Sequence, residues 1–180
     1  MKILAISGSA REASTNTALL RGIKCLAPES VEFSVFHTLN VLPIFSPDFE
    51  GEKTPAVVSE FMETVSVTDG IIISSPEYIR AIPGGLKNAI DWMVSRSEII
   101  GKPIALVHAS HRGDDMLTSL RLVLSTVSDN FMEDIFLRAP LIGKSPKEIE
   151  DFIRKSEHQL QISTFLSSFL GAIQQIDSQA

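Results

Sequence analysis

Three nearly continuous apolar runs constrain how this chain can fold: KILAIS at residues 2–7, DGIIISS at 69–75 and KPIALVHAS at 102–110. Strands that are buried on both faces of a parallel sheet have this pattern, because neither face meets water. Two less apolar runs, VEFSVFH at 31–37 and FMEDIFL at 131–137, are further strand candidates, and the first alternates as an edge strand does. Helical patterns separate the runs, so the sequence predicts an α/β fold with helices on both faces of a parallel sheet.

The C-terminal region is predicted to be helical. Ser145-Pro146-Lys147-Glu148 has the pattern of a capping box with proline at the first helical position, so a helix should begin there. Apolar residues continue at helical spacing to Ile173, and we expect a break near Ser163.

In an open α/β sheet, ligands bind outside the carboxyl ends of the strands. Four segments are expected to meet at that edge: residues 7–16, the irregular loop 40–50, residues 75–85 and residues 109–115. A binding site built from these loops is therefore predicted.

The first of these loops has the residue types that bind a phosphate group. Its hydroxyl and amide side chains can donate hydrogen bonds, and an arginine supplies a fixed positive charge at a helix N-terminus. An ordinary strand-to-helix turn whose serines cap the helix remains an alternative. The loop lacks the P-loop pattern, the GxGxxG fingerprint, a nucleophilic cysteine and a GxSxG elbow. The candidate phosphate ligands are Ser9, Arg11, Ser14, Thr15 and Asn16.

Charge and composition exclude several function classes. The formal net charge of −6 disfavours nucleic acid and anionic membrane surfaces as partners. No apolar stretch is long enough for a membrane span, and the N-terminus lacks a signal-peptide pattern, so a cytoplasmic location is expected. The histidines form no spaced metal motif with carboxylates, and no metal site is predicted. The 180 residues suit a single domain spanning 1–180.

Two motifs together resemble the NAD(P)H-dependent FMN reductases, a flavodoxin-like family that includes quinone, chromate and azo-dye reductases. Residues 8–16 match GSxRxxSxN, and residues 76–92 match PEYNxSxPGxLKNAIDW. LPIFSPDFE and GKPIALVHAS resemble further segments of the family, so the resemblance covers about residues 1–130.

The resemblance implies a flavodoxin-like three-layer sandwich with a five-stranded parallel sheet in the order 2-1-3-4-5. It also implies that bound FMN passes two electrons, by hydride transfer, from NADPH or NADH to a small-molecule acceptor such as a quinone, free flavin or oxyanion. The FMN phosphate would contact Ser9, Arg11, Ser14 and Asn16 of the first loop. The residues that would border the isoalloxazine ring are Pro76, Glu77, Tyr78, Ser110 and Gly113.

The ring-side segments depart from the family pattern. Ile79 and Ala81 replace an asparagine and a serine, and the usually glycine-rich fourth loop reads SHRGDD. Arg80 and Arg112 are predicted to form a positive rim that attracts NADPH or an anionic acceptor. For Arg112, a surface ion pair with Asp114 or Asp115 is the alternative. His111 is a candidate general acid, against the alternative of a solvent-exposed loop histidine.

The oligomeric state and the position of its interface are further expectations. The resemblance implies a homodimer or tetramer, and we expect an interface on the helix 86–96, where Trp92 lies off the apolar stripe. A Trp packed against a neighbouring loop is the alternative.

Two other functions are alternatives to an enzyme. The chain could be a flavin-binding electron carrier or redox-sensing module without steady NAD(P)H turnover, or a family member that has lost FMN.

Overall fold

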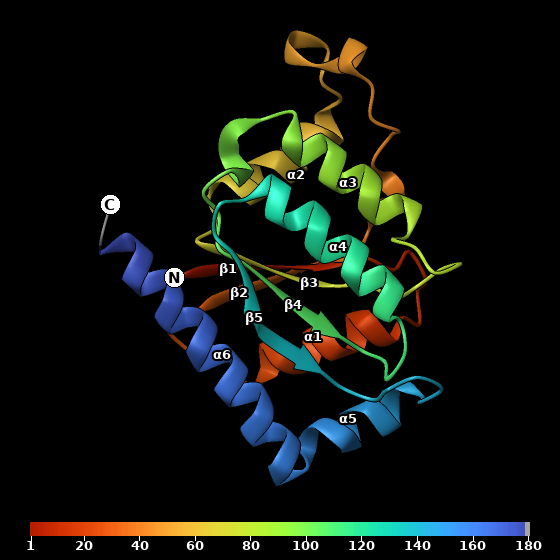
Figure 1. The fold of residues 1–180 in the computed structure, drawn as a ribbon, viewed down its shortest axis with the longest axis vertical. Coiled ribbons are helices and arrows are strands. Elements are labelled where there is room, and N and C mark those ends of the chain that lie inside the picture. The colour runs from red at the N-terminus through yellow and green to blue at the C-terminus, as the bar shows by residue number, and fades with distance from the viewer. Residues whose placement is uncertain (179–180) are drawn as a thin grey trace.

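The computed structural model describes residues 1–178 and contains a five-stranded, fully parallel sheet in the order β2-β1-β3-β4-β5 (Figure 1). This confirms the predicted flavodoxin-like fold and strand order. The strands are β1 (Lys2–Ser7), β2 (Glu32–Phe36), β3 (Gly70–Ser74), β4 (Ile104–His108) and β5 (Phe131–Arg138). The α-helices are α1 (Thr15–Cys25), α2 (Ala56–Ser66), α3 (Gly84–Val94), α4 (Asp114–Val127), α5 (Pro146–Arg154) and α6 (Ser156–Asp177).

Two hydrophobic clusters form the core, one on each face of the sheet. Helices α2, α3 and α4 cover one face, and α1, α5 and α6 cover the other (Figure 1). The central strands β1, β3 and β4 are almost wholly buried, whereas β2 and β5 are edge strands with exposed positions. The continuous apolar runs therefore correspond to the three central strands, as predicted.

The segment between β2 and α2 contains three short 3-10 helices: η1 (Leu39–Val41), η2 (Pro47–Phe49) and η3 (Gly51–Lys53). A fourth, η4 (Ser97–Ile99), follows α3. Much of the β2–α2 segment projects away from the sheet at the top of Figure 1. Its first part packs against α3. The side chain of Asn88 on α3 accepts a hydrogen bond from the Phe45 N–H at 2.8 Å and donates one to the Pro43 carbonyl at 2.9 Å.

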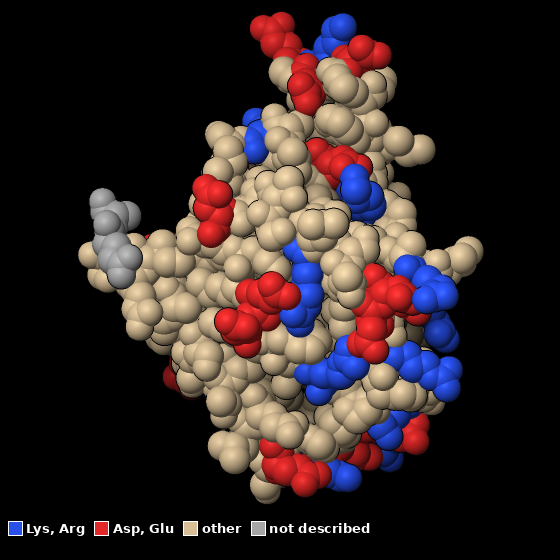
Figure 2. Space-filling view, in the orientation of Figure 1, with Lys and Arg blue, Asp and Glu red and all other residues tan. Residues whose placement is uncertain are grey.

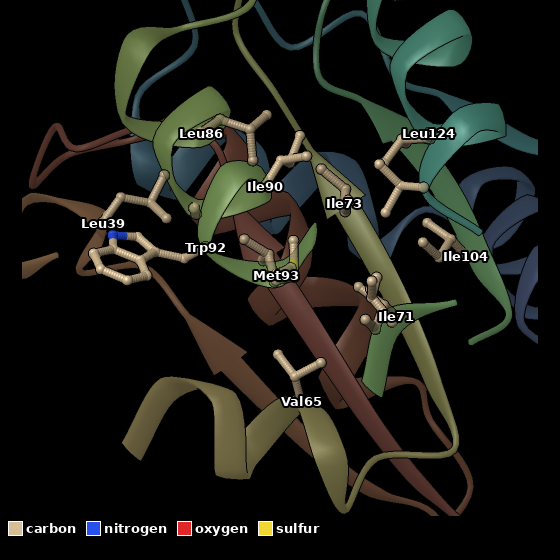
Figure 3. Packing of buried hydrophobic residues seen from close by; sticks show 14 of the residues in the cluster. Leu39, Val65, Ile71, Ile73, Leu86, Ile90, Trp92, Met93, Ile104 and Leu124 are labelled. Carbon is tan, nitrogen blue, oxygen red and sulfur yellow. The ribbon is translucent and has the colours of Figure 1, made fainter. Parts of the chain in front are cut away.

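Trp92 is buried, so the prediction that it faces outward to a partner is wrong. Only 1% of its surface is exposed, and its indole N–H donates to the Pro43 carbonyl at 2.8 Å. Phe45 packs edge-on against the ring at 5.0 Å between centroids, and Figure 3 shows Leu39 beside it. The β2–α2 segment thus covers the side of α3 that periodicity alone leaves unpartnered.

The predicted capping box is present at the start of α5: Ser145 accepts from the Glu148 N–H, and the Glu148 carboxylate accepts from the Ser145 N–H. The predicted break near Ser163 is wrong. The helical region is interrupted at Lys155, whose ψ of 135° is extended, and α6 continues through Ser163. Ile162 and Phe165 on either side of Ser163 are buried in the core, and this packing outweighs the modest helix propensity of serine.

Candidate functional site

A cavity of about 290 Å³ lies at the carboxyl ends of β1, β3 and β4, where the sequence predicts a site. Three of the four expected segments line it, but the loop 40–50 contributes no lining residue, and that part of the prediction is wrong. The β5–α5 loop contributes instead. The lining residues are Thr15, Asn16, residues 75–78, His108, Ala109, Ser110, Arg112, Gly113 and Ile142.

The β1–α1 loop presents a helix N-terminus to this cavity. Ser14 is the N-cap of α1 and accepts a hydrogen bond from the Thr17 N–H at 3.3 Å. The first turn of α1 has no acidic residue, so the partial positive charge of the helix end is not neutralised within the helix. Ser9 is a buried residue of the same loop and accepts from the Arg11 N–H at 3.3 Å, while the Arg11 side chain is exposed. This end of the cavity is therefore suited to an anion.

Buried hydroxyl and amide groups hold this loop against β3. Ser74 donates to the Asn16 side-chain oxygen, and Thr17 donates to Ser7, both at 2.8 Å. The Asn16 oxygen thus accepts a hydrogen bond, whereas its amide N–H groups have no hydrogen-bond partner within residues 1–178. They are left to donate toward the cavity, which Asn16 lines.

Gly8 allows the β1–α1 and β3–α3 loops to approach each other closely. Its N–H donates to the Ser74 carbonyl at 2.7 Å. A Cβ at this position would lie 3.1 Å from the Ser75 Cα and 2.9 Å from the Ser75 Oγ. A side chain here would therefore push apart the two loops that form one wall of the cavity.

The β3–α3 loop contains a tight turn at its exposed tip. Tyr78 and Ala81 exchange two backbone hydrogen bonds, of 3.1 and 3.2 Å, around Ile79 and Arg80. Both central residues have left-handed backbones, with φ of 52° and 59°, a conformation that costs energy for a β-branched residue such as isoleucine. Earlier in the loop, the Glu77 carboxylate accepts from the Met116 N–H at 3.2 Å. It thereby caps α4 and ties this loop to the β4–α4 segment.

The β4–α4 loop forms the wall around Ser110 and Gly113. Ser110 accepts a hydrogen bond from the Arg112 N–H at 2.9 Å. Gly113 has a φ of 98°, and a Cβ there would lie 2.9 Å from the Nε2 atom of His108. Glycine is required because it supplies the left-handed backbone and leaves space for that ring.

Of the two arginines predicted to form a positive rim, Arg80 is in an ion pair, whereas Arg112 has none within the described residues. The Nε atom of Arg80 lies 2.6 Å from the Asp115 carboxylate, and Asp114 pairs with Arg138. The hydrogen bond from Arg80 lowers the pKa of the Asp115 carboxyl below its ordinary value. Figure 2 shows acidic and basic side chains close together near the end of α4 where these loops lie. Arg112 lines the cavity and has no ion pair within the described residues, so it is the stronger candidate for attracting an anion.

The structure brings most of the predicted site residues together. Ser9, Arg11 and Ser14 lie in the loop beside the cavity, Arg80 lies at the tip of the next loop, and His111 is exposed and does not line it. The other predicted residues line the cavity: Asn16, Pro76, Glu77, Tyr78, Ser110, Arg112 and Gly113.

Two lining residues, His108 and Ile142, lie outside all four predicted segments. A histidine that ends a buried strand at the carboxyl edge was the available signal for His108. No pattern in the sequence pointed to Ile142.

Residues 1–178 contain no group of three or more His, Cys, Asp or Glu side chains placed to hold a metal ion. They also contain no helix that is both long and apolar enough to cross a bilayer.

Comparison with known proteins gives a family match. The sequence profile of the NADPH-dependent FMN reductases matches residues 1–138. A quinone reductase of Escherichia coli K12 is 34% identical over 116 residues, which are 63% of this chain and 61% of the relative. A 2-hydroxy-1,4-benzoquinone reductase of Burkholderia sp. is 36% identical over 113 residues, 61% of each chain. The chain thus matches about three fifths of the length of these relatives.

Solved structures share the fold at low sequence identity. The flavoenzyme NAD(P)H:(acceptor) oxidoreductase FerB of Paracoccus denitrificans has a TM-score of 0.69 at 22% identity, over 95% of this chain and 98% of its own. An FMN-dependent NADH-azoreductase of Bacillus anthracis, solved with FMN, has a TM-score of 0.61 at 13% identity, over 92% of this chain and 100% of its own. These structural similarities establish the fold, and they cover more of the chain than the sequence profile, which ends at residue 138.

Proposed function

Because this chain belongs to the NADPH-dependent FMN reductase family, we propose that it binds FMN in the cavity and passes electrons from NAD(P)H to a small acceptor. Quinones, free flavins and oxyanions are the acceptor classes. The observation that carries the proposal is one cavity that joins an uncompensated helix N-terminus to two close backbone loops. An anionic group at the helix end and a flat ring between the loops would fit this arrangement.

FMN would supply the two-electron redox chemistry. Ser9, Arg11, Ser14 and Asn16 would hold its phosphate through hydroxyl and amide donors, the start of α1 and the arginine charge. Ring contacts are assigned to a second set of residues: Pro76, Glu77, Tyr78, Ser110 and Gly113.

The chain's own groups would position the ring and control its electrostatics. Backbone N–H groups of the β3–α3 and β4–α4 loops would donate to the polar edge of the ring, where charge gathers on reduction. No side-chain nucleophile is required. His111 does not line the cavity, which weakens its assignment as a general acid. Cavity-side donors are therefore the groups expected to stabilise the developing charge.

The visible spectrum of the protein with FMN tests the function. We expect bound FMN to shift the flavin spectrum and to support steady NAD(P)H oxidation with a quinone. Binding without steady oxidation would instead favour an electron carrier or redox-sensing module. If added FMN gives no spectral change and no quenching of flavin fluorescence, the proposal is wrong.

Arg112 is expected to steer the reductant, and Arg80 to contribute less. Replacing Arg112 with alanine should slow flavin reduction by NADPH more than reduction by a neutral chemical reductant, because the arginine charge attracts only the anionic NADPH. The loss should shrink as salt is raised, since screening acts over about 8–10 Å at physiological ionic strength. Arg80→Ala should have a smaller effect, because Arg80 lies at the exposed tip of its loop and, unlike Arg112, does not line the cavity. Stopped-flow measurements at two salt concentrations check this; equal, salt-independent slowing with both reductants would show that Arg112 shapes the cavity instead.

A homodimer or tetramer and a cytoplasmic location remain proposals that rest on the family resemblance and the sequence. The burial of Trp92 removes the argument that placed an interface on α3.

A further inference from the structure

His108, the last residue of β4, lies between the two loops that would enclose the flavin ring. Its side chain is buried at 1% exposure and lines the cavity. The Nδ1 atom lies 3.2 Å from the Ser75 carbonyl of the β3–α3 loop, and Nε2 contacts the Arg112 carbonyl of the β4–α4 loop. We propose that His108 is a positioning residue that holds these loops together more tightly when its ring is protonated, and that FMN binding therefore draws a proton onto it.

The number of ring donors supports the proposal. A neutral imidazole has one N–H group and one nitrogen lone pair, whereas both ring nitrogens of His108 face carbonyl oxygens, which can only accept. In the neutral ring, one carbonyl thus faces a lone pair. The imidazolium donates from both nitrogens and satisfies both carbonyls, so protonation strengthens the connection between the loops.

The ring is packed so that it transmits this change. The Cα of Gly113 lies against it, since a Cβ there would be 2.9 Å from Nε2 and 3.0 Å from Cε1. A shift of the ring would therefore move Gly113 and the start of α4. The Glu77 carboxylate, which caps α4 at the Met116 N–H, adds a second connection between the same two loops.

Burial opposes protonation in the free protein. It lowers the pKa of His108 below the ordinary 6.5, and Arg138 on β5 also lowers it, while Asp114 on α4 and the two carbonyls raise it. Arg138 and Asp114 pair with each other, so their effects on the ring partly cancel. With a folded-state pKa below 6.5, the unfolded chain binds more protons, and the stability present above about pH 6.5 is lost as the pH falls.

An anionic ligand acts against this effect of burial. The inference here rests on the proposed function: FMN carries a phosphate dianion, and its ring gathers negative charge on reduction. Negative charge in the cavity favours the imidazolium of a histidine that lines it. By linkage, a ligand that raises the pKa of His108 binds more tightly to the protonated protein. FMN affinity should therefore increase as the pH falls through the titration range of His108.

The test measures flavin affinity from about pH 8 to about pH 5 by quenching of flavin fluorescence. His108→Gln is the matched variant, because its side-chain amide can still donate to the Arg112 carbonyl but does not titrate. Relative to this variant, wild-type affinity for FMN should rise about three- to tenfold toward acid, tenfold corresponding to a one-unit rise in pKa. His37→Gln, at an exposed histidine beyond β2, should behave as wild type. The FMN phosphate itself titrates near about pH 6, and the comparison with His108→Gln removes this contribution, because it is the same for both proteins.

A second readout needs no variant. The ¹⁵N resonances of the His108 ring report its protonation directly, and its pKa should be higher with flavin bound than without. An unchanged pKa, or the same pH dependence of affinity in wild type and His108→Gln, would overturn the proposal.

The FMN-free protein separates this proposal from the proposed function. There, His108→Ala should speed amide hydrogen exchange in both loops, while His108→Gln should speed it less. Absence of flavin binding in every form would overturn the proposed function, whereas unchanged exchange in His108→Ala would overturn the positioning role.

Discussion

Replacing Trp92 with alanine is expected to lower the free energy of unfolding by about 3–5 kcal/mol, the largest stability effect that we predict. The indole is almost fully buried between α3 and the β2–α2 segment, so its removal leaves a cavity that the surrounding backbone cannot close. Urea denaturation of wild type and variant measures the change. The loss should come as a lower midpoint with a similar slope, because the surface exposed on unfolding changes little.

Trp92→Phe is the matched control. It keeps most of the apolar volume and removes the N–H that donates to the Pro43 carbonyl at 2.8 Å. Because Pro43 is exposed, water can replace the lost donor, and the cost should be about 1 kcal/mol for the hydrogen bond plus a small packing loss. If alanine cost no more than phenylalanine, the β2–α2 segment would not be held by the indole.

Replacing Arg11 with alanine is expected to weaken FMN binding by about 1.5–3 kcal/mol, or roughly 10- to 150-fold in Kd. Arg11 lies in the loop before α1, its side chain is exposed, and it has no ion pair within the described residues. Its guanidinium is therefore available for a bidentate hydrogen bond to phosphate, which is stronger than a neutral one. Titration of FMN, followed by fluorescence quenching, measures the change.

Two controls distinguish a direct phosphate contact from a general loss of charge. Arg21→Ala removes the same charge from an exposed position inside α1, close to His37, and should change Kd little. Riboflavin binding should hardly differ between wild type and Arg11→Ala, because riboflavin has no phosphate. Equal losses in Arg11→Ala and Arg21→Ala would mean that Arg11 acts only through the overall field.

The strands could be predicted because they depend on local pattern, whereas their order was implied by the family resemblance. The runs at 2–7, 69–75 and 102–110 are apolar on both faces, which suits only central strands of a covered sheet, and the structure places them there. The capping box at Ser145 was equally visible, because both of its hydrogen bonds join residues three positions apart.

The candidate site was predictable where it depends on chain order. Parallel strands end at one edge, so the loops around Asn16, Pro76 and Gly113 had to meet there. Sequence alone could not place the loop 40–50, which packs on α3 outside the cavity, or identify Ile142, which reaches it from the β5–α5 loop.

Tertiary structure decided what depends on contacts between distant residues. Asn88 and Trp92 are bound by a segment more than forty positions earlier in the chain, and Arg80 is paired with Asp115 thirty-five positions later. Neither pairing leaves a periodic signal, because periodicity reports only which face of an element is apolar. His108 shows the same limit: the sequence places it at the end of a strand, but its two carbonyl partners are set by how the loops fold around it. The pattern of the sequence therefore determined the strands and the edge at which the cavity lies, and the family resemblance implied the strand order, while the ion pairs near the cavity and the contacts of His108 arise only from packing.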